Sequence, residues 1–202
     1  MTEFYFTNIK NISLSELNLS KIPKYRREKI ARLPSGSDKL RSLAAGLLIE
    51  KFIGNKEIKN GKYGKPYCEG GRCFNLSHSG DYVILAVSDC EVGCDIECVR
   101  FLDYERLGKK VFHENEREKL GNLSDKQDCF FEIWTRKEAF VKFLGEGFHF
   151  KMTSLDLSDL PEKFEYNNRT CFFKEYMLCG FKIMLCCEKN DFPEDIIEIK
   201  FN

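Results

Sequence analysis

Two short segments carry residues whose types and spacing suit phosphate chemistry. The first is the run Gly93-Cys94-Asp95-Ile96-Glu97, where two carboxylates at i and i+2 of a predicted strand leave the same face. The second is Trp134–Lys142, where Glu138 and Lys142 are at i and i+4 of a predicted helix, one turn apart. Three such carboxylates suit a hard divalent cation, and the lysine suits a phosphate beside it. The pattern therefore predicts a Mg²⁺-dependent phosphoryl-transfer site.

A run of basic residues is a further candidate for binding anions. Arg26 and Lys29 belong to a basic segment at 24–32, and Arg41 follows on the next predicted helix. Taken alone, such a run is more often a solvated helix face than a binding site.

A short loop at 61–67 also carries a basic residue in a defined setting. Gly64 permits a turn, and Pro66 keeps its predecessor Lys65 extended. The lysine is therefore expected to project, although by itself the segment reads simply as a loop.

The segment at 74–80 combines hydroxyl and imidazole groups. Ser77, His78 and Ser79 follow one another and precede Gly80, just ahead of a predicted strand. A single histidine is most often structural, but its neighbouring hydroxyls make this one an equally good candidate for binding phosphate.

Hydrophobic patterning predicts the elements that must position these groups. The periodicity indicates strands at 3–10, 82–88, 91–97, 153–157, 171–176, 181–187 and 196–201, and helices at 24–33, 37–53 and 126–144. The strands at 82–88 and 91–97 are expected to form a hairpin that turns near Asp89-Cys90. The order of elements predicts an α+β fold in two halves joined near 97–103, with the site in the cleft between them.

Composition narrows the range of partners. Lys+Arg and Asp+Glu balance at 32 each, which argues against a nucleic-acid or anionic-membrane partner. No apolar run approaches the roughly 20 residues of a membrane helix, and the start at Met1 lacks the pattern of a secretion signal, so we expect a cytoplasmic protein. The ten cysteines are interpreted as reduced thiols, with a metal or redox cluster of Cys90, Cys94 and Cys98 as the alternative.

Taken together and in order, these motifs resemble those of a known family. They are Lys65-Pro66, Asn75–Gly80, Gly93–Glu97, and Trp134–Lys142 followed by Gly145-Glu146-Gly147. The chain is similar to the 4′-phosphopantetheinyl transferases of the larger, pseudo-dimeric type that activates peptide and polyketide synthetases. The resemblance implies two similar α/β subdomains in a pseudo-twofold arrangement. They would span residues 1–98 and 99–202, and the second would also dock the carrier protein.

The resemblance also implies a role for each candidate residue, with coenzyme A as the substrate. Arg26, Lys29 and Arg41 would bind the 3′-phosphate, and Lys65 and Pro66 would lie at the adenine side. Ser77 and His78 would reach the 3′-phosphate and the pyrophosphate, and Lys142 would also bind the pyrophosphate. The ligands of Mg²⁺, with Mn²⁺ as an alternative, would be Asp95, Glu97 and Glu138. Glu138 is the candidate base for the acceptor hydroxyl.

The implied reaction transfers 4′-phosphopantetheine from coenzyme A to a serine of an apo acyl or peptidyl carrier protein. The enzyme is expected to act as a monomer, with carrier docking around 101–119. Two other functions are weighed against it. One is a coenzyme A-binding module without turnover, which the presence of all three carboxylates and Lys142 disfavours. The other is a metal-dependent phosphodiesterase or nuclease, which the neutral net charge disfavours.

Overall fold

The protein folds into helices on either side of two central sheets. The structure is a computed structural model and describes residues 1–22, 24–34, 36–54 and 56–201. The helices are α1 (Glu16–Ser20), α2 (Lys24–Arg32), α3 (Gly36–Phe52), α4 (Tyr104–Val111), α5 (Glu114–Gly121) and α6 (Gln127–Leu144). The strands are β1 (Glu3–Asn8), β2 (Ile58–Asn60), β3 (Pro66–Cys68), β4 (Cys73–Ser79), β5 (Tyr82–Ser88), β6 (Val92–Cys98), β7 (Lys163–Tyr166), β8 (Arg169–Leu178), β9 (Phe181–Cys187) and β10 (Ile197–Glu198).

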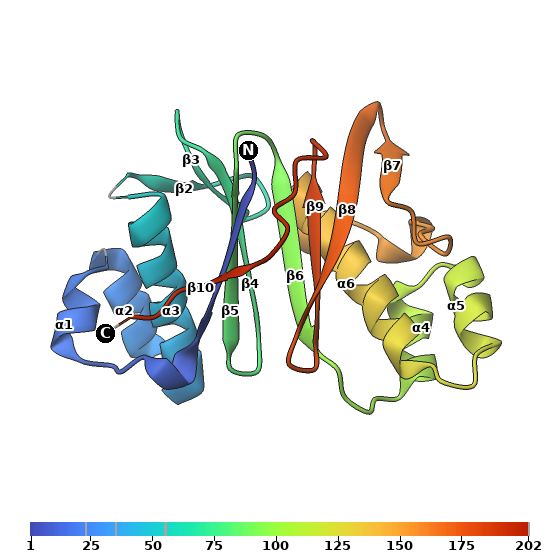
Figure 1. Cartoon of the computed structure of the whole chain (residues 1–202), viewed down its shortest axis with the longest axis horizontal. Helices are drawn as coiled ribbons and strands as arrows, with labels where there is room; N and C mark the ends of the chain where they lie inside the picture. Colours follow the sequence, from blue (N-terminus) through green and yellow to red (C-terminus); the bar gives the residue numbers. More distant parts are fainter. Residues whose placement is uncertain (23, 35, 55, 202) are drawn as a thin grey trace.

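Two four-stranded sheets form the centre of the molecule. The first has the strand order β10-β1-β5-β4 and the second the order β6-β9-β8-β7, while β2 and β3 form a separate ribbon. Helices α1 to α3 lie on the outer side of the first sheet, and α4 to α6 lie on the outer side of the second (Figure 1). The mixed α/β class predicted from the sequence is confirmed.

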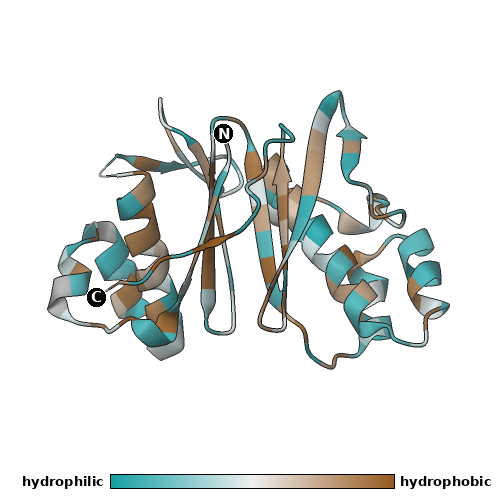
Figure 2. Cartoon of the chain, in the orientation of Figure 1, coloured by the Kyte–Doolittle hydropathy of each residue, from teal (hydrophilic) through white to brown (hydrophobic). Residues whose placement is uncertain are grey.

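Both faces of the central strands are buried. In β5, Leu85 packs with α3, whereas Ile84 and Ala86 face the apolar core between the two sheets. In β6, Cys94 and Ile96 face the same central core, so Asp95 and Glu97 must face the opposite way, toward α6. The hydropathy colouring shows apolar strands at the centre and polar outer helix faces (Figure 2). Strand alternation thus orients the two carboxylates.

The expected hairpin between 82–88 and 91–97 is wrong. Strand β5 pairs with β1 on one edge and with β4 on the other, so neither of its edges is left for β6. Strand β6 instead crosses to the second sheet and pairs with β9, where Asp95 lies opposite Met184. Although adjacent in sequence, β5 and β6 therefore belong to different sheets.

Two other segments differ from the prediction. The segment at 153–157 forms no strand: Met152–Ser154 is a 3₁₀ helix. The alternation that suggested a strand arises because Leu155 and Leu157 both reach the core beneath α6. The segment at 74–80 is itself strand β4 and does not merely precede one.

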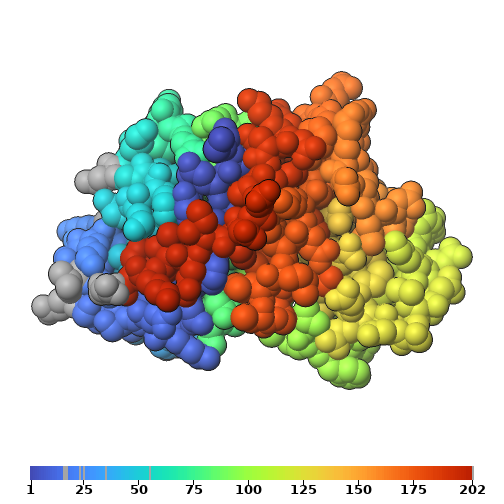
Figure 3. All heavy atoms as spheres, viewed as in Figure 1, coloured from blue at the N-terminus to red at the C-terminus, as the bar shows by residue number. Residues whose placement is uncertain are grey.

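The final segment returns to the first sheet. Strand β10 pairs in parallel with β1, with Ile197 opposite Tyr5, and the amide of Ile199 donates to the Phe6 carbonyl at 2.8 Å. In the space-filling view the red C-terminal residues lie across the N-terminal part of the chain (Figure 3). Among the described residues, the structure has no helix that is long and apolar enough to cross a membrane.

Candidate active site

Close packing of α6 on β6 creates the carboxylate cluster. A Cβ atom added to Gly93 would collide with the carbonyl oxygen of Ala139 and the amide nitrogen of Phe143. Helix and strand therefore touch backbone to backbone here, which brings Glu138 and Lys142 over the face of β6 that carries the acidic residues. Helix α6 ends at Gly145, whose left-handed φ of 75° is typical of a glycine at a helix C-terminus.

A chain of short hydrogen bonds links three predicted site residues. The Lys142 ammonium donates to Asp95 Oδ1 at 2.6 Å and to Ser77 Oγ at 2.8 Å. Ser77 in turn donates its hydroxyl proton to Asp95 Oδ1 at 2.8 Å. These side chains come from β4, β6 and α6. The fold therefore gathers residues that are far apart in the sequence.

The carboxylates of the cluster repel one another. Burial raises the pKa of Glu138, and the nearby charges of Asp95 and Glu97 raise it further. The pKa of Glu97 is raised for the same reasons, first by burial and then by Asp95. Burial by itself would lower the pKa of Lys142, but the Asp95 charge contributes most to the opposing effect and the net pKa is raised. The lysine therefore stays protonated, and both glutamates hold a proton more tightly than an exposed glutamate does.

One oxygen of the cluster has no partner. Asp95 Oδ2 is buried and accepts no hydrogen bond within the described part of the chain. As the side chains stand, no three His, Cys, Asp or Glu residues among those described are gathered closely enough to hold a metal ion. The donor set nevertheless fits a hard cation in its chemistry, because an unpartnered carboxylate oxygen and two repelling carboxylates are the groups such an ion would stabilise.

A basic cavity of about 540 Å³ lies on the other face of β4. Its lining includes Arg26, Lys29, Asp38, Arg41, Pro66 and His78. Arg41 is held in place by a 2.9 Å hydrogen bond to the Gly80 carbonyl and a 2.5 Å ion pair with Asp38. Burial lowers the pKa of His78, and the charges of Arg41 and Lys142 add to this effect. His78 is therefore neutral near pH 7 and acts as a hydrogen-bonding group.

Neighbouring residues of β4 thus face different parts of the candidate site. Because strand side chains alternate, Ser77 faces the carboxylate cluster while His78 faces the basic cavity. The family resemblance implies that both residues reach the phosphates of one ligand. The structure brings them near one another, but on opposite faces of the strand.

Lys65 does not line the basic cavity. Its ammonium donates to Glu91 at 2.7 Å and to the carbonyl oxygens of Val92 and Phe143 at 2.9 and 3.1 Å. The side chain was expected to project from its loop; it instead ties that loop to the start of β6 and the end of α6. The neighbouring Pro66 does line the cavity.

Lys137, next to Glu138 in the sequence, is a structural residue. It is fully buried and forms a 2.6 Å ion pair with Glu116, which is also fully buried. Glu116 in addition accepts the backbone N–H of His113 at the start of α5. The pair therefore fastens α5 to α6 and keeps Lys137 away from the cluster.

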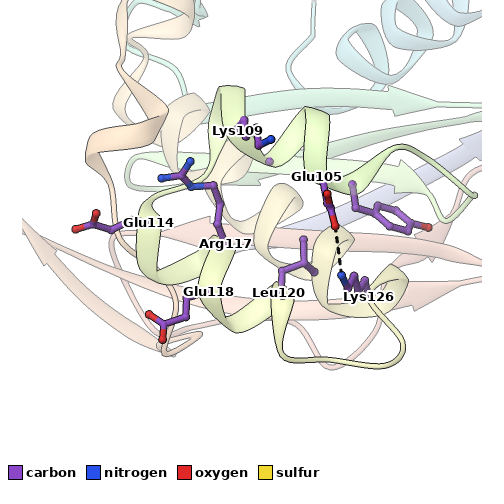
Figure 4. Close-up of a pocket in the computed structure, with 10 residues that line it drawn as sticks. Glu105, Lys109, Glu114, Arg117, Glu118, Leu120 and Lys126 are labelled. Carbon is purple, nitrogen blue, oxygen red and sulfur yellow. Dashed lines mark ion pairs between the residues drawn. The ribbon is translucent and has the colours of Figure 1, made fainter.

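Two further cavities lie in the second half of the chain. One of about 430 Å³ is lined by Glu138 and Lys142 together with the segment at 147–153, where Phe148 is fully exposed. The other, of about 330 Å³, lies between α4 and α5, where Glu105 and Lys126 form an ion pair at 3.7 Å (Figure 4). No predicted site residue lines the cavity between α4 and α5. We therefore place the candidate site at the cavity lined by Glu138 and Lys142.

The structure is that of a mixed α/β protein in which a basic cavity adjoins a cluster of carboxylates and a lysine. Comparisons with known proteins identify a family for this chain. The family model of the 4′-phosphopantetheinyl transferase superfamily matches residues 91–183, which include β6 and α6. The chain belongs to this superfamily.

Individual relatives cover most of the sequence. The 4′-phosphopantetheinyl transferase gsp of Aneurinibacillus migulanus is 33% identical over 167 residues, or 76% of this chain and 70% of the relative. The transferase ffp of Bacillus subtilis is 30% identical over 198 residues, 87% of this chain and 86% of its own. The transferase Sfp of Bacillus subtilis strain 168 is 29% identical over 209 residues, which cover 93% of this chain and 91% of the relative.

Proposed function

We propose that this protein transfers the 4′-phosphopantetheine group of coenzyme A to a serine hydroxyl of an apo acyl or peptidyl carrier protein, releasing adenosine 3′,5′-bisphosphate. The observation that carries the proposal is the position of the Lys142 ammonium. It is 2.6 Å from Asp95, one helical turn from Glu138, and shares the cluster with Ser77 beside the basic cavity. Membership of the superfamily supports the same reaction.

The basic cavity would receive the nucleotide end of coenzyme A. Arg26, Lys29 and Arg41 would pair with the 3′-phosphate, and a neutral His78 would donate a hydrogen bond to it. Pro66 and its loop would border the adenine. Lys65 would act by holding this loop against β6, which its three hydrogen bonds support.

The carboxylates of Asp95, Glu97 and Glu138 would hold Mg²⁺, or Mn²⁺ in its place. The bound cation would supply positive charge for the pyrophosphate oxygens as negative charge develops on them. The unpartnered Oδ2 of Asp95 supports this role, because a buried carboxylate oxygen without a partner is costly.

The chain's own groups would carry out the remaining steps. Lys142 would bind the pyrophosphate, and Ser77 would hold the lysine and Asp95 in register. Glu138 would accept the proton of the carrier serine as the serine oxygen bonds to the β-phosphorus. The bond from that phosphorus to the bridging oxygen would break, and the adenosine bisphosphate would leave with the electron pair. The apolar-lined cavity beside Glu138 and Phe148 would admit the acceptor.

The finer architecture is part of the proposal. We infer two similar α/β subdomains, residues 1–98 and 99–202, in a pseudo-twofold arrangement. The pair of four-stranded sheets with α3 and α6 on their outer faces supports it. We further propose a cytoplasmic monomer that acts on neither nucleic acid nor membranes, with carriers of peptide or polyketide synthesis docking around 101–119. The 88% exposure of Phe101 supports a docking surface there.

The decisive experiment mixes the protein with coenzyme A, Mg²⁺ and purified apo-carriers of the fatty-acid, peptide and polyketide types. Mass spectrometry should show at least one carrier heavier by a single phosphopantetheinyl arm. The gain should disappear when the cation is chelated. If no carrier gains this mass, the transferase proposal is wrong.

A further inference from the structure

The two sheets meet at a seam that contains no backbone ladder. Strand β4 is the edge of the first sheet and β6 is the edge of the second, and within the described chain neither pairs with the other. Side chains of β4 bridge the gap instead. Asn75 Oδ1 accepts the backbone N–H of Cys94 at 2.9 Å, and Ser79 Oγ accepts the backbone N–H of Cys98 at 3.1 Å. These bonds satisfy amides that an open strand edge would otherwise leave unpaired.

The same row of side chains reaches the acidic residues. Ser77 donates to Asp95 at 2.8 Å, and Ser79 donates to Glu97 Oε2 at 3.1 Å. Two hydroxyls at i and i+2 of one strand therefore match two carboxylates at i and i+2 of the other. Hydroxyl groups of the first sheet therefore orient the carboxylates of the second sheet.

Ser79 has little freedom in this arrangement. A hydroxyl offers one proton and two lone pairs. The Cys98 amide takes one lone pair, which turns the proton toward Glu97. Ser79 itself is only 9% exposed, so water has little access to compete for that proton.

Glu97 has a competing partner on the solvent side. The guanidinium of Arg100 lies 3.8 Å from Glu97 Oε2, and its side chain is 54% exposed. Ser79 and Arg100 thus approach the same carboxylate oxygen, and without the Ser79 hydroxyl the arginine would be left to draw it toward solvent, away from Asp95 and Glu138.

We propose that Ser79 is a positioning residue whose hydroxyl holds Glu97 in the inward orientation needed to ligate the divalent cation. The inference rests on the proposed function. It adds to that function a residue of the first sheet that prepares the cation site on the second.

The test compares Ser79→Ala with Ser79→Thr, which keeps a hydroxyl, and with Ser88→Ala. Ser88 is a matched control because it is a fully buried serine on β5 whose hydroxyl contacts Thr2, Cys90 and Cys187 instead of the carboxylates. Mn²⁺ binding is measured by electron paramagnetic resonance on the protein without coenzyme A. The Mg²⁺ concentration for half-maximal transfer is measured separately.

We expect Ser79→Ala to weaken Mn²⁺ binding and raise the required Mg²⁺ by about 10- to 100-fold, the usual effect of losing an outer partner of a metal ligand. The KM for coenzyme A should change less than twofold. Ser79→Thr should recover most of the affinity, and Ser88→Ala should bind Mn²⁺ like the wild type. Adding Arg100→Ala to Ser79→Ala should recover part of the loss, because the competing partner is gone.

Wild-type Mn²⁺ affinity in Ser79→Ala would overturn the proposal, as would an equal loss in Ser88→Ala. If circular dichroism shows that Ser79→Ala is unfolded, Ser79→Cys replaces it, since a thiol keeps the volume but is a weak donor. A wild-type protein that binds Mn²⁺ but modifies no carrier would refute the transferase function while leaving the Ser79 comparison valid.

Discussion

Single residues show a conflict between stability and the proposed chemistry. Asp95, Glu97 and Glu138 lie within electrostatic range of one another, and the pKa values of both glutamates are raised. The Lys142 ammonium offsets part of this repulsion through its contact with Asp95. Such strain in the absence of a ligand is typical of a site built to hold a cation.

We predict that Glu138→Gln abolishes transfer yet stabilises the protein without metal. Loss of the ligand and base should lower the rate by at least about 10²–10³. Removal of a repelled charge should raise the melting temperature at pH 7 by a few degrees, since about 1 kcal/mol corresponds to about 2–4 °C at this size. Glu194→Gln, at an exposed position after β9 and outside the proposed docking surface, is the control and should change neither quantity.

The pH dependence of this stability difference has a defined sign. Because the pKa of folded Glu138 is raised, the folded state holds the proton more tightly than the unfolded state. The wild type should therefore approach the melting temperature of Glu138→Gln as the pH falls through the raised pKa toward the ordinary range of glutamate. A difference that grows on acidification would contradict the assigned pKa direction.

Arg41 should govern affinity for coenzyme A more than turnover. It lines the basic cavity and is oriented by Asp38 and Gly80. Arg41→Ala should weaken coenzyme A binding about tenfold or more, since a charge-assisted bond contributes about 1.5–3 kcal/mol. Calorimetric titration measures this, with exposed Arg32→Ala on α2 as the control. Equal affinities for the two variants would remove Arg41 from the binding site.

At the scale of elements, the contact between β6 and α6 positions the cluster. The approach depends on Gly93, because any side chain there would meet the backbone of the helix. A strand glycine often marks this kind of close approach. The helix contributes Glu138 and Lys142, so its distance from the strand controls the whole site.

Gly93→Ala should therefore displace α6, destabilise the fold by about 1–3 kcal/mol, and sharply lower transfer. Gly121→Ala at the end of α5 is the matched control, because an added Cβ there has no neighbour within 4 Å. The control should be neutral or stabilising by up to about 1 kcal/mol. Urea unfolding of both variants measures the difference; similar midpoints would show that the backbone contact is not limiting.

At the scale of the whole molecule, the C-terminal segment links the two four-stranded sheets. Ile196 packs against the core between the sheets, whereas Ile199 and Phe201 pack against the core beneath α3. The segment leaves β9 of the second sheet and ends on β1 of the first. It therefore packs on both the sheet that borders the basic cavity and the sheet that carries the carboxylates of β6.

Ile199→Ala should destabilise the protein by about 1–2 kcal/mol, roughly half the cost at a fully buried site. Ile197→Ala is the control, because that side chain, two residues earlier in β10, is 55% exposed. Scanning calorimetry should show a lower melting temperature for the first variant and little change for the second. Equal stabilities would mean that the packing of this segment on the first sheet does not stabilise the protein.

The errors in the sequence prediction come from interactions that are not local. The patterns at 82–88 and 91–97 correctly marked two strands, but their pairing depended on which edges β1, β4 and β9 occupied. The role of Ser79 in the seam was missed for the same reason, although its place in the hydroxyl-rich run was a usable signal. Lys65 was expected to project because its partners lie 26 to 78 residues away.

The amino-acid sequence alone determined several local features: the strands at 82–88, 91–97 and 181–187, the long helix at 126–144, the shared face of Asp95 and Glu97, and the end of α6 at Gly145. These depend on backbone periodicity and on neighbours within a few residues. Tertiary structure decided that α6 lies on β6, that Ser77 and His78 serve opposite faces, and that β4 holds the acids of β6. These depend on packing between distant segments, and strand and helix periodicity carries no information about which distant surfaces will meet.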